Sequence, residues 1–140
     1  MKVFFDASAL VPLVHTRDQW HFSVRRHLRL LGDQHRLTIA TTNWTLYEAL
    51  TILKRAGHHR VVELHTYARD TVEILPVERT VETEALRRFI AWSDKGASVV
   101  DHANLLSAIA SGCDAILTFD TDFVPIAQGT GIRVLGAGGR

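Results

Sequence analysis

The sequence predicts an α/β fold with three layers, in which helices cover both faces of a central, mostly parallel sheet. Short apolar segments of strand character alternate with longer segments whose apolar residues recur at helical spacing. This alternation is typical of parallel sheets, which are buried on both faces. The predicted connections are only a few residues long, and 140 residues is the length of one domain. We therefore expect residues 1–140 to form a single domain.

The N-terminal segment is expected to contain a strand followed by a helix. A strand is expected over residues 2–5, in which residues 3–5 are β-branched or aromatic, and the next residues, Asp6 to Ser8, are expected to end it. Apolar residues then recur on one helix face over residues 18–31, and Gly32 is expected to end that helix.

The middle of the chain is expected to contain a second strand, over residues 37–40, and two helices. Thr45 and Glu48 have the spacing of a capping box, in which a hydroxyl and an acid three residues later bond the free backbone N–H groups of a helix start. A helix is therefore expected to begin at Thr45 and to end near Gly57. The next helix is expected over residues 59–70.

The C-terminal half continues the alternation of helices and strands. Ser98 and Asp101 form a second capping-box pattern, so a helix is expected to begin there and to end at residues 111–112. The remaining elements are expected to be a helix over residues 80–93 and strands over residues 73–77, 114–119 and 133–135.

Four acidic residues are expected to meet at one edge of this sheet: Asp6, Glu48, Asp101 and Asp120. Asp6 and Asp120 each follow a predicted strand directly, and parallel strands end at the same edge. Glu48 lies in the first predicted turn of a helix that leaves the second strand. Asp101 lies in the first turn of a helix that runs antiparallel to the strand after it, so its N-terminus is expected at this edge too.

A group of carboxylates in one cleft predicts either raised pKa values or a bound cation. Like charges about 4 Å apart repel by about 1 kcal/mol in water and by about 4 kcal/mol at an effective dielectric constant of 20. Oxygen ligands favour a hard ion such as Mg²⁺ or Mn²⁺, which also binds phosphate oxygens. Such a site suits hydrolysis of a phosphodiester by activated water. Each acid alone also fits a helix cap or a turn, but their common position favours the metal site.

Composition places limits on partners and location. The net charge of +1 means that any contact with nucleic acid must be local. Arg25 and Arg26, on one face of the first predicted helix, are candidates for such a contact, although a solvated helix face is the alternative. A single cysteine excludes an internal disulfide. Since neither a signal segment nor a membrane span is visible, we expect a cytoplasmic protein with no membrane partner.

Four segments, in this order, resemble motifs of the PIN-domain nucleases, in particular the VapC-like toxins of toxin–antitoxin pairs. The first ends a strand in Asp6-Ala-Ser-Ala-Leu, and the second is Thr-Leu-Tyr-Glu48-Ala-Leu. The third is Ser98-Val-Val-Asp101, and the fourth is Thr118-Phe-Asp-Thr-Asp-Phe. The resemblance extends from residue 1 to about residue 135.

The resemblance implies a PIN-like three-layer fold and a Mg²⁺- or Mn²⁺-dependent endoribonuclease. It also implies a homodimer and a cognate antitoxin that covers the cleft. The positions of the acids in these motifs imply that Asp6 and Asp101 are the principal metal ligands, with Glu48 near the ion or bound to it through water. The fourth carboxylate would be that of Asp120 or Asp122.

Two polar residues are further candidates for substrate contact. Ser8 either orients Asp6 or bonds the turn backbone. Asn104 lies one turn beyond Asp101 and either touches phosphate or is solvated. His102 lies about 100° around the helix from Asp101 and is not expected to be a ligand.

Other functions fit the sequence less well. A phosphotransfer receiver domain needs paired acids near the first strand, and residues 6–10 contain only one. A non-catalytic adaptor, or an RNA-processing PIN-like protein without a toxin role, is the remaining alternative. The acids present at every motif argue against a non-catalytic protein.

Overall fold

A five-stranded sheet forms the centre of the computed structural model, which describes residues 1–93 and 96–137. Its strand order is β3-β2-β1-β4-β5, and all four pairings between these strands are parallel. The predicted α/β class with a parallel sheet is therefore confirmed. The strands are β1 (Lys2–Phe5), β2 (Thr38–Thr42), β3 (Val72–Leu75), β4 (Ala115–Thr118) and β5 (Arg133–Gly136).

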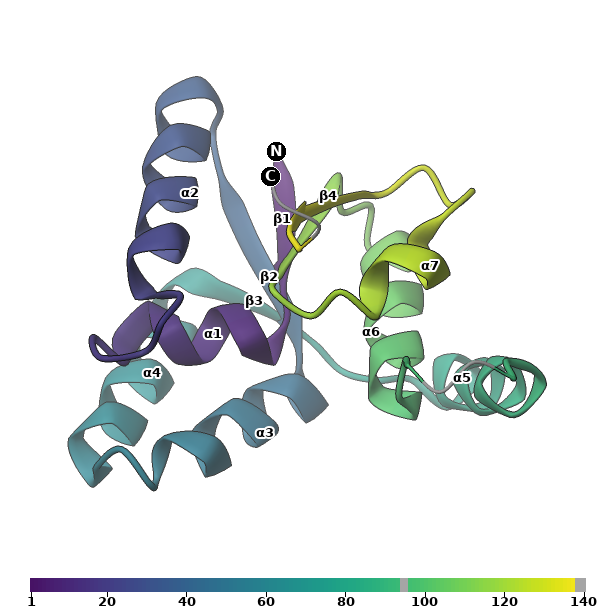
Figure 1. Cartoon of the computed structure of the whole chain (residues 1–140), viewed down its shortest axis with the longest axis horizontal. Coiled ribbons are helices and arrows are strands. Elements are labelled where there is room, and N and C mark those ends of the chain that lie inside the picture. Colours follow the sequence, from purple (N-terminus) through teal and green to yellow (C-terminus); the bar gives the residue numbers. More distant parts are fainter. Residues whose placement is uncertain (94–95, 138–140) are drawn as a thin grey trace.

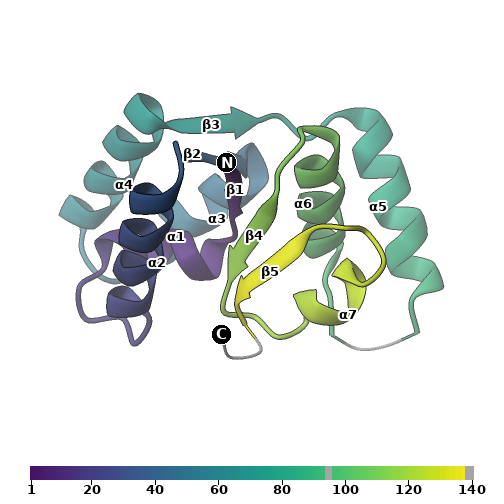
Figure 2. The ribbon, with the colours of Figure 1, turned by 90° about the horizontal axis from the view of Figure 1, so that it is seen from above.

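Helices cover both faces of the sheet (Figures 1 and 2). One layer contains α1 (Ala7–Val14), α2 (His21–Gln34), α3 (Asn43–Leu53) and α4 (His58–Thr71). The other contains α6 (Val99–Ala110) and α7 (Phe123–Ala127), with α5 (Arg79–Ala91) packed on the outside of α6. None of the helices in the described ranges is long and apolar enough to cross a membrane.

The alternating side chains of β1 connect the two apolar cores. Val3 and Phe5 pack toward α1–α4, whereas Phe4 packs with Ile116 toward α6 and α7. All four side chains are completely buried. Burial of a side chain of this size contributes about 1.5–3 kcal/mol, so the central strands are held firmly from both sides.

Two helices were not predicted. Helix α1 begins directly after Asp6 and buries every residue except Ser8, so it has no polar face from which a helical period could be read. It also contains Pro12, which usually argues against a helix interior. Helix α7 has only five residues, too few to show a period.

Two predicted helix boundaries were wrong. Helix α2 passes through Gly32 and ends at Gln34, because Gly32 adopts no left-handed conformation there. Helix α3 begins at Asn43 with Thr42 as its N-cap, whose hydroxyl accepts a hydrogen bond from the Thr45 N–H at 3.2 Å. Thr45 is therefore inside the helix, and Glu48 lies in its second turn rather than at its start.

The second capping box is confirmed. The Ser98 hydroxyl accepts a hydrogen bond from the Asp101 N–H at 3.1 Å, and the Asp101 carboxylate accepts one from the Ser98 N–H at 2.9 Å. These two bonds fix the N-terminus of α6 and the position of the Asp101 side chain.

Candidate active site

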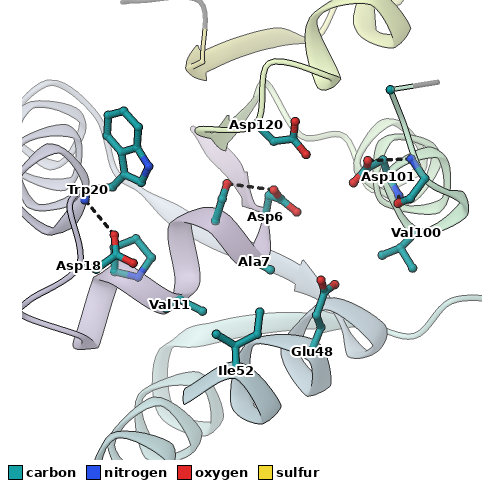
Figure 3. Close-up of a pocket in the computed structure, with 14 residues that line it drawn as sticks. Asp6, Ala7, Val11, Asp18, Trp20, Glu48, Ile52, Val100, Asp101 and Asp120 are labelled. Atoms are coloured by element: carbon teal, nitrogen blue, oxygen red, sulfur yellow. Dashed lines mark hydrogen bonds between the residues drawn. The ribbon is translucent and has the colours of Figure 1, made fainter. Parts of the chain in front are cut away.

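A cavity of 660 Å³ opens where β1 and β4 end (Figure 3). Its lining includes all four acids that the sequence places at this edge: Asp6, Glu48, Asp101 and Asp120. They come from the end of β1, the second turn of α3, the N-terminus of α6 and the loop after β4. The structure thus brings together around one cavity residues that are far apart in the sequence.

Asp6 is the most deeply buried of these acids, with 7% of its surface exposed. Its N–H continues the β1–β4 pairing by donating to the Leu117 carbonyl at 3.1 Å. Burial raises the pKa of its carboxyl group, and hydrogen bonds from neighbouring backbone and hydroxyl groups oppose this rise only in part. Burial therefore makes the ionised form of Asp6 less favourable than that of an aspartate in water, and a nearby cation would oppose this effect.

Two hydroxyl groups hold the Asp6 carboxylate. Ser8 Oγ and Thr118 Oγ1 each donate to Asp6 Oδ2 at 3.0 Å. Ser8 Oγ also accepts from the Phe119 N–H at 2.9 Å, and Thr118 Oγ1 accepts from the Asp120 N–H at 3.0 Å. Of the two roles expected for Ser8, the structure therefore supports the one in which it orients Asp6. Ser8 also links Asp6 to the loop after β4. Its hydroxyl is occupied by these bonds, which argues against direct contact with substrate.

Glu48 faces the cavity from an exposed position on α3. Partial burial and the charge of Asp6 raise its pKa. Thr42 supplies the cap of this helix, so Glu48 does not have the capping role that its sequence position suggested. Its long side chain can rotate toward the other acids, which the shorter Asp101, bound to Ser98, cannot do as freely.

Asp101 has a pKa raised to about 6. Burial is the largest cause, and the charges of Asp6 and Asp120 add to it, whereas the hydrogen bond from the Ser98 N–H lowers it. Together with the interaction between Asp6 and Glu48, this connects all four carboxylates electrostatically across the cavity.

Asp120 and Asp122 occupy different places. Asp120 lines the cavity, and its Oδ1 accepts a hydrogen bond from the Asp122 N–H at 2.9 Å. The Asp122 carboxylate lies against Gly96, where a Cβ atom would come within 2.7 Å of Asp122 Oδ1. This placement favours Asp120 as the fourth acid of the cavity.

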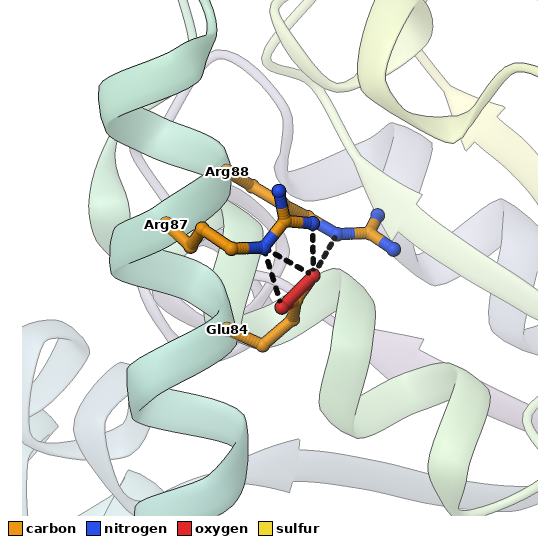
Figure 4. A network of polar contacts seen from close by, with 3 residues as sticks. All are labelled: Glu84, Arg87 and Arg88. Carbon is orange, nitrogen blue, oxygen red and sulfur yellow. Dashed lines mark hydrogen bonds and ion pairs between the residues drawn. The ribbon is translucent and has the colours of Figure 1, made fainter.

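The negative charge of the cavity has no compensating side chain among its described lining residues, which contain no Lys, Arg or His. A contrasting case lies on α5, where Glu84 bonds both Arg87 and Arg88 (Figure 4). Hydrogen bonds from Arg87 and then Arg88 lower the pKa of Glu84 to about 2. A carboxylate with cationic partners ionises easily, whereas the pKa values of Asp6, Glu48 and Asp101 are raised.

The acids surround the cavity without forming a closed ligand cage. Within the described residues, no three His, Cys, Asp or Glu side chains are close enough to form a ready-made metal site. The donor set nevertheless fits a hard divalent ion, because it consists of carboxylate oxygens facing a solvent-filled cavity. Binding of an ion would require small side-chain rotations, for which Glu48 has the most freedom.

The other candidate contacts lie away from this cavity. Asn104 is completely buried, and its Oδ1 accepts from the hydroxyls of Thr42 and Thr45 at 2.8 and 2.9 Å. This position argues against both a solvated side chain and contact with phosphate. Arg25 and Arg26 are exposed on α2 outside the cavity lining, and Arg25 donates to the Leu13 carbonyl at 3.2 Å.

His102 is not among the residues that line the cavity and lies beside Trp92 instead. Its ring is 6.0 Å from that of Trp92, centroid to centroid, and is almost fully buried. Burial and the charge of Arg88 lower its pKa, which favours the neutral ring. This orientation agrees with the expectation that His102 is not a metal ligand.

Several residues of the site were not singled out from the sequence. Thr118 was noted as part of a motif, but its bond to Asp6 follows from the β1–β4 pairing, which joins distant segments. Asp18, Trp20 and Ile52 line the cavity beside the acids. For Ile52, its spacing of one helical turn from Glu48 was a usable signal.

The pKa of Asp101 predicts a measurable pH dependence. Folded Asp101 binds its proton more tightly than unfolded Asp101, so the free energy of unfolding without metal should fall as pH rises from about 4 to 6. A rise in the pKa from 3.8 to about 6 corresponds to about 3 kcal/mol at 1.36 kcal/mol per pKa unit. Because solvent partly screens the group, we expect a smaller contribution of about 1–2 kcal/mol. Urea unfolding in EDTA at pH 4, 5, 6 and 7 measures it.

Asp101→Asn isolates this contribution, because asparagine keeps an acceptor for the Ser98 N–H. The free energy of unfolding of wild type should fall relative to that of Asp101→Asn as pH rises from 4 to 6, because only wild type contains the titrating carboxyl group at this position. Parallel curves for the two proteins would contradict the raised pKa. Titration of His102 works in the opposite direction and cancels in this difference.

Comparison with known proteins supports one family. The family model described as the PIN domain matches residues 3–128. A search of curated protein sequences found no significant match. Among solved structures, VapC20 of Mycobacterium tuberculosis, described as a sarcin–ricin loop cleaving toxin, superposes with a TM-score of 0.76 at 24% identity. The match covers 89% of this chain and 94% of that one.

Two further structures have the same fold at lower identity. VapBC2 from Rickettsia felis, bound to a promoter DNA fragment, gives a TM-score of 0.69 at 15% identity and covers 96% of this chain and 97% of that one. PAE2754 from Pyrobaculum aerophilum gives a TM-score of 0.60 at 18% identity, and the match covers 96% of this chain and 90% of that one. Because the family model spans most of the sequence, from β1 to beyond α7, this chain belongs to the PIN domain family.

Proposed function

We propose that this protein is a divalent-metal-dependent endoribonuclease and the toxin of a toxin–antitoxin pair. The observation that carries the proposal is the group of four acids around one cavity, without a cationic lining residue in the described chain. Membership of the PIN family supports nuclease chemistry at this position. The description of the similar VapC20 as an RNA-loop-cleaving toxin supports RNA as the substrate.

The residues proposed to hold the metal are Asp6, Asp101 and Asp120, with Glu48 binding directly or through water. The favoured ions are Mg²⁺ and Mn²⁺, since both prefer oxygen ligands and bind phosphate. A bound divalent ion would compensate part of the negative charge of the carboxylates, attract the phosphodiester and help to activate water for hydrolysis. Ser8 and Thr118 act one step further out, by fixing the direction of the Asp6 carboxylate.

The pairing with an antitoxin is proposed by analogy with the VapBC2 complex. Exposed apolar side chains grouped on one helix face support contacts with other proteins, because contiguous apolar patches mark interaction surfaces. Leu86, Phe89 and Ile90 have i, i+3, i+4 spacing on α5 and are 44%, 41% and 79% exposed. This face of α5 is the proposed contact for a protein partner, either the antitoxin or a second copy in a homodimer. We also propose a cytoplasmic location, which agrees with an RNA substrate.

Metal binding is the first test. A divalent ion that binds the folded state stabilises it by about 2.7 kcal/mol at a concentration 100 times its Kd. We therefore expect Mn²⁺ or Mg²⁺ to raise the melting temperature, and EDTA to stop cleavage of structured RNA without unfolding the protein. Thermal melting with and without the ion, beside an RNA cleavage assay, measures both effects.

Glu84→Gln provides the control, because Glu84 is a partly exposed acid on α5 that does not line the cavity. This variant should show the same metal-induced rise as wild type, whereas Asp101→Asn should lose most of it. Metal-independent cleavage would contradict the mechanism. Metal binding without RNA cleavage would favour the alternative of a PIN-like adaptor without nuclease activity.

A further inference from the structure

The cavity has an apolar wall beside its acidic part. Val11 of α1, Trp20 before α2 and Ile52 of α3 line the same cavity as the four acids. Ile52 follows Glu48 by one helical turn, so α3 presents an acid and an apolar side chain on the same face. Figure 3 shows Val11 and Ile52 next to one another on the same side of the cavity as Glu48.

Trp20 is held in a fixed orientation at this wall. Its ring stacks on Phe119 with a centroid distance of 4.6 Å and an interplanar angle of 5°. The Asp18 carboxylate accepts a hydrogen bond from the backbone N–H of Trp20 at 2.8 Å, which fixes the main chain at this residue. Despite these contacts, 37% of Trp20 is exposed, and 45% of Ile52 is exposed. Large apolar groups are thus kept in contact with water beside a polar site.

The charges around the wall determine what can occupy it. Asp18 adds a fifth carboxylate to the cavity lining, and no basic side chain lies among the described lining residues. A phosphate group would therefore be repelled from the wall and is accommodated only where a cation compensates the acids. A nucleobase, in contrast, is uncharged and has flat apolar faces that stack on aromatic side chains.

On these grounds, and resting on the proposed nuclease function, we propose that Val11, Trp20 and Ile52 form a subsite for the nucleobase next to the bond that is cut. A base in a duplex is stacked on both sides and cannot reach this wall, so the base must be unpaired. The subsite therefore makes cleavage selective for single-stranded or looped RNA.

The decisive experiment couples a protein change to an RNA change. Cleavage is first mapped on a single-stranded RNA, and the nucleotide on each side of the cut is then replaced in turn by an abasic one. Trp20→Ala should lower kcat/KM by at least about 5-fold on the normal RNA, as expected for a lost stacking contact. The abasic RNA should be cut correspondingly more slowly by wild type, but Trp20→Ala should cut both RNAs at similar rates.

Two variants control for damage to the fold. Trp20→Phe keeps an aromatic face and should recover most of the lost activity. Trp92→Ala removes a tryptophan of nearly equal exposure, 39%, that lies outside the cavity lining. It should leave the difference between normal and abasic RNA unchanged. If Trp20→Ala and wild type show the same abasic penalty, the subsite is overturned.

A binding measurement separates this proposal from the nuclease function. Fluorescence of single-stranded RNA carrying 2-aminopurine should be quenched by the Asp6→Asn variant and not by the variant that also carries Trp20→Ala. Quenching without any cleavage by wild type would retain the subsite and reject the nuclease. Cleavage by wild type without quenching, and without a smaller abasic penalty in Trp20→Ala, would reject the subsite alone. In that case, weaker binding of an antitoxin peptide to Trp20→Ala would assign the apolar wall to the peptide.

Discussion

Replacement of Asp6 with asparagine is expected to abolish RNA cleavage and, at the same time, to stabilise the metal-free protein. Asparagine keeps an oxygen that can accept from the Ser8 and Thr118 hydroxyls, but it removes a negative charge that burial makes unfavourable. Changes in residues that merely support metal ligands cost about 10- to 100-fold in activity, so loss of a direct ligand should cost at least about 100-fold. Urea unfolding in EDTA at pH 7.5 and a cleavage assay in Mg²⁺ measure the two effects.

Asp70→Asn provides the matched control, since it makes the same chemical change at an exposed position on α4. It should change neither cleavage nor the response to metal. A lower stability of metal-free Asp6→Asn, or cleavage at the wild-type rate, would show that Asp6 is a structural residue and not a metal ligand.

Among the substitutions proposed for this protein, replacement of Asn104 with alanine is expected to lower the free energy of unfolding most. The side chain is fully buried, and its Oδ1 is the acceptor for the hydroxyls of Thr42 and Thr45. Alanine would leave two buried donors without this acceptor and would create a small cavity. Each unsatisfied group costs about 1–3 kcal/mol, so we expect a loss of roughly 2–4 kcal/mol in urea unfolding.

The residual activity of Asn104→Ala distinguishes a structural role from substrate contact. At a temperature where the variant is still folded, its KM for RNA should equal that of wild type. Asn43→Ala is the comparison, because Asn43 accepts a single hydrogen bond, from the Val77 N–H at 3.0 Å, and is half-buried. A raised KM with unchanged stability for Asn104→Ala would support direct contact with RNA instead.

The positions of the acids could be predicted because they follow from the order of elements. Asp6 and Asp120 come after strands that are recognisable locally, and Asp101 lies in a local capping box. Glu48 reached the cavity although its helix begins five residues earlier than Glu48, at Asn43. The first two turns of a helix that leaves the carboxyl edge of a strand both lie near that edge, so the error in the boundary did not displace the acid from the site.

The features that could not be predicted depend on contacts between distant segments. Burial of Asn104 requires Thr42 and Thr45, which are 62 and 59 residues away in the sequence. The bond from Thr118 to Asp6 requires the pairing of β1 with β4. Helix α1 was not predicted because it is buried on nearly all sides, which removes the polar face that a helical pattern needs.

The pairing of β1 with β4 also governs when the protein can become active during its synthesis. Thr118, which holds Asp6, is synthesised 112 residues after it. At about 5–20 residues per second, this interval lasts roughly 6–22 s. The acidic site therefore stays incomplete for that time after Asp6 has been made, and the proposed nuclease activity cannot begin before β4 has been synthesised and has paired with β1.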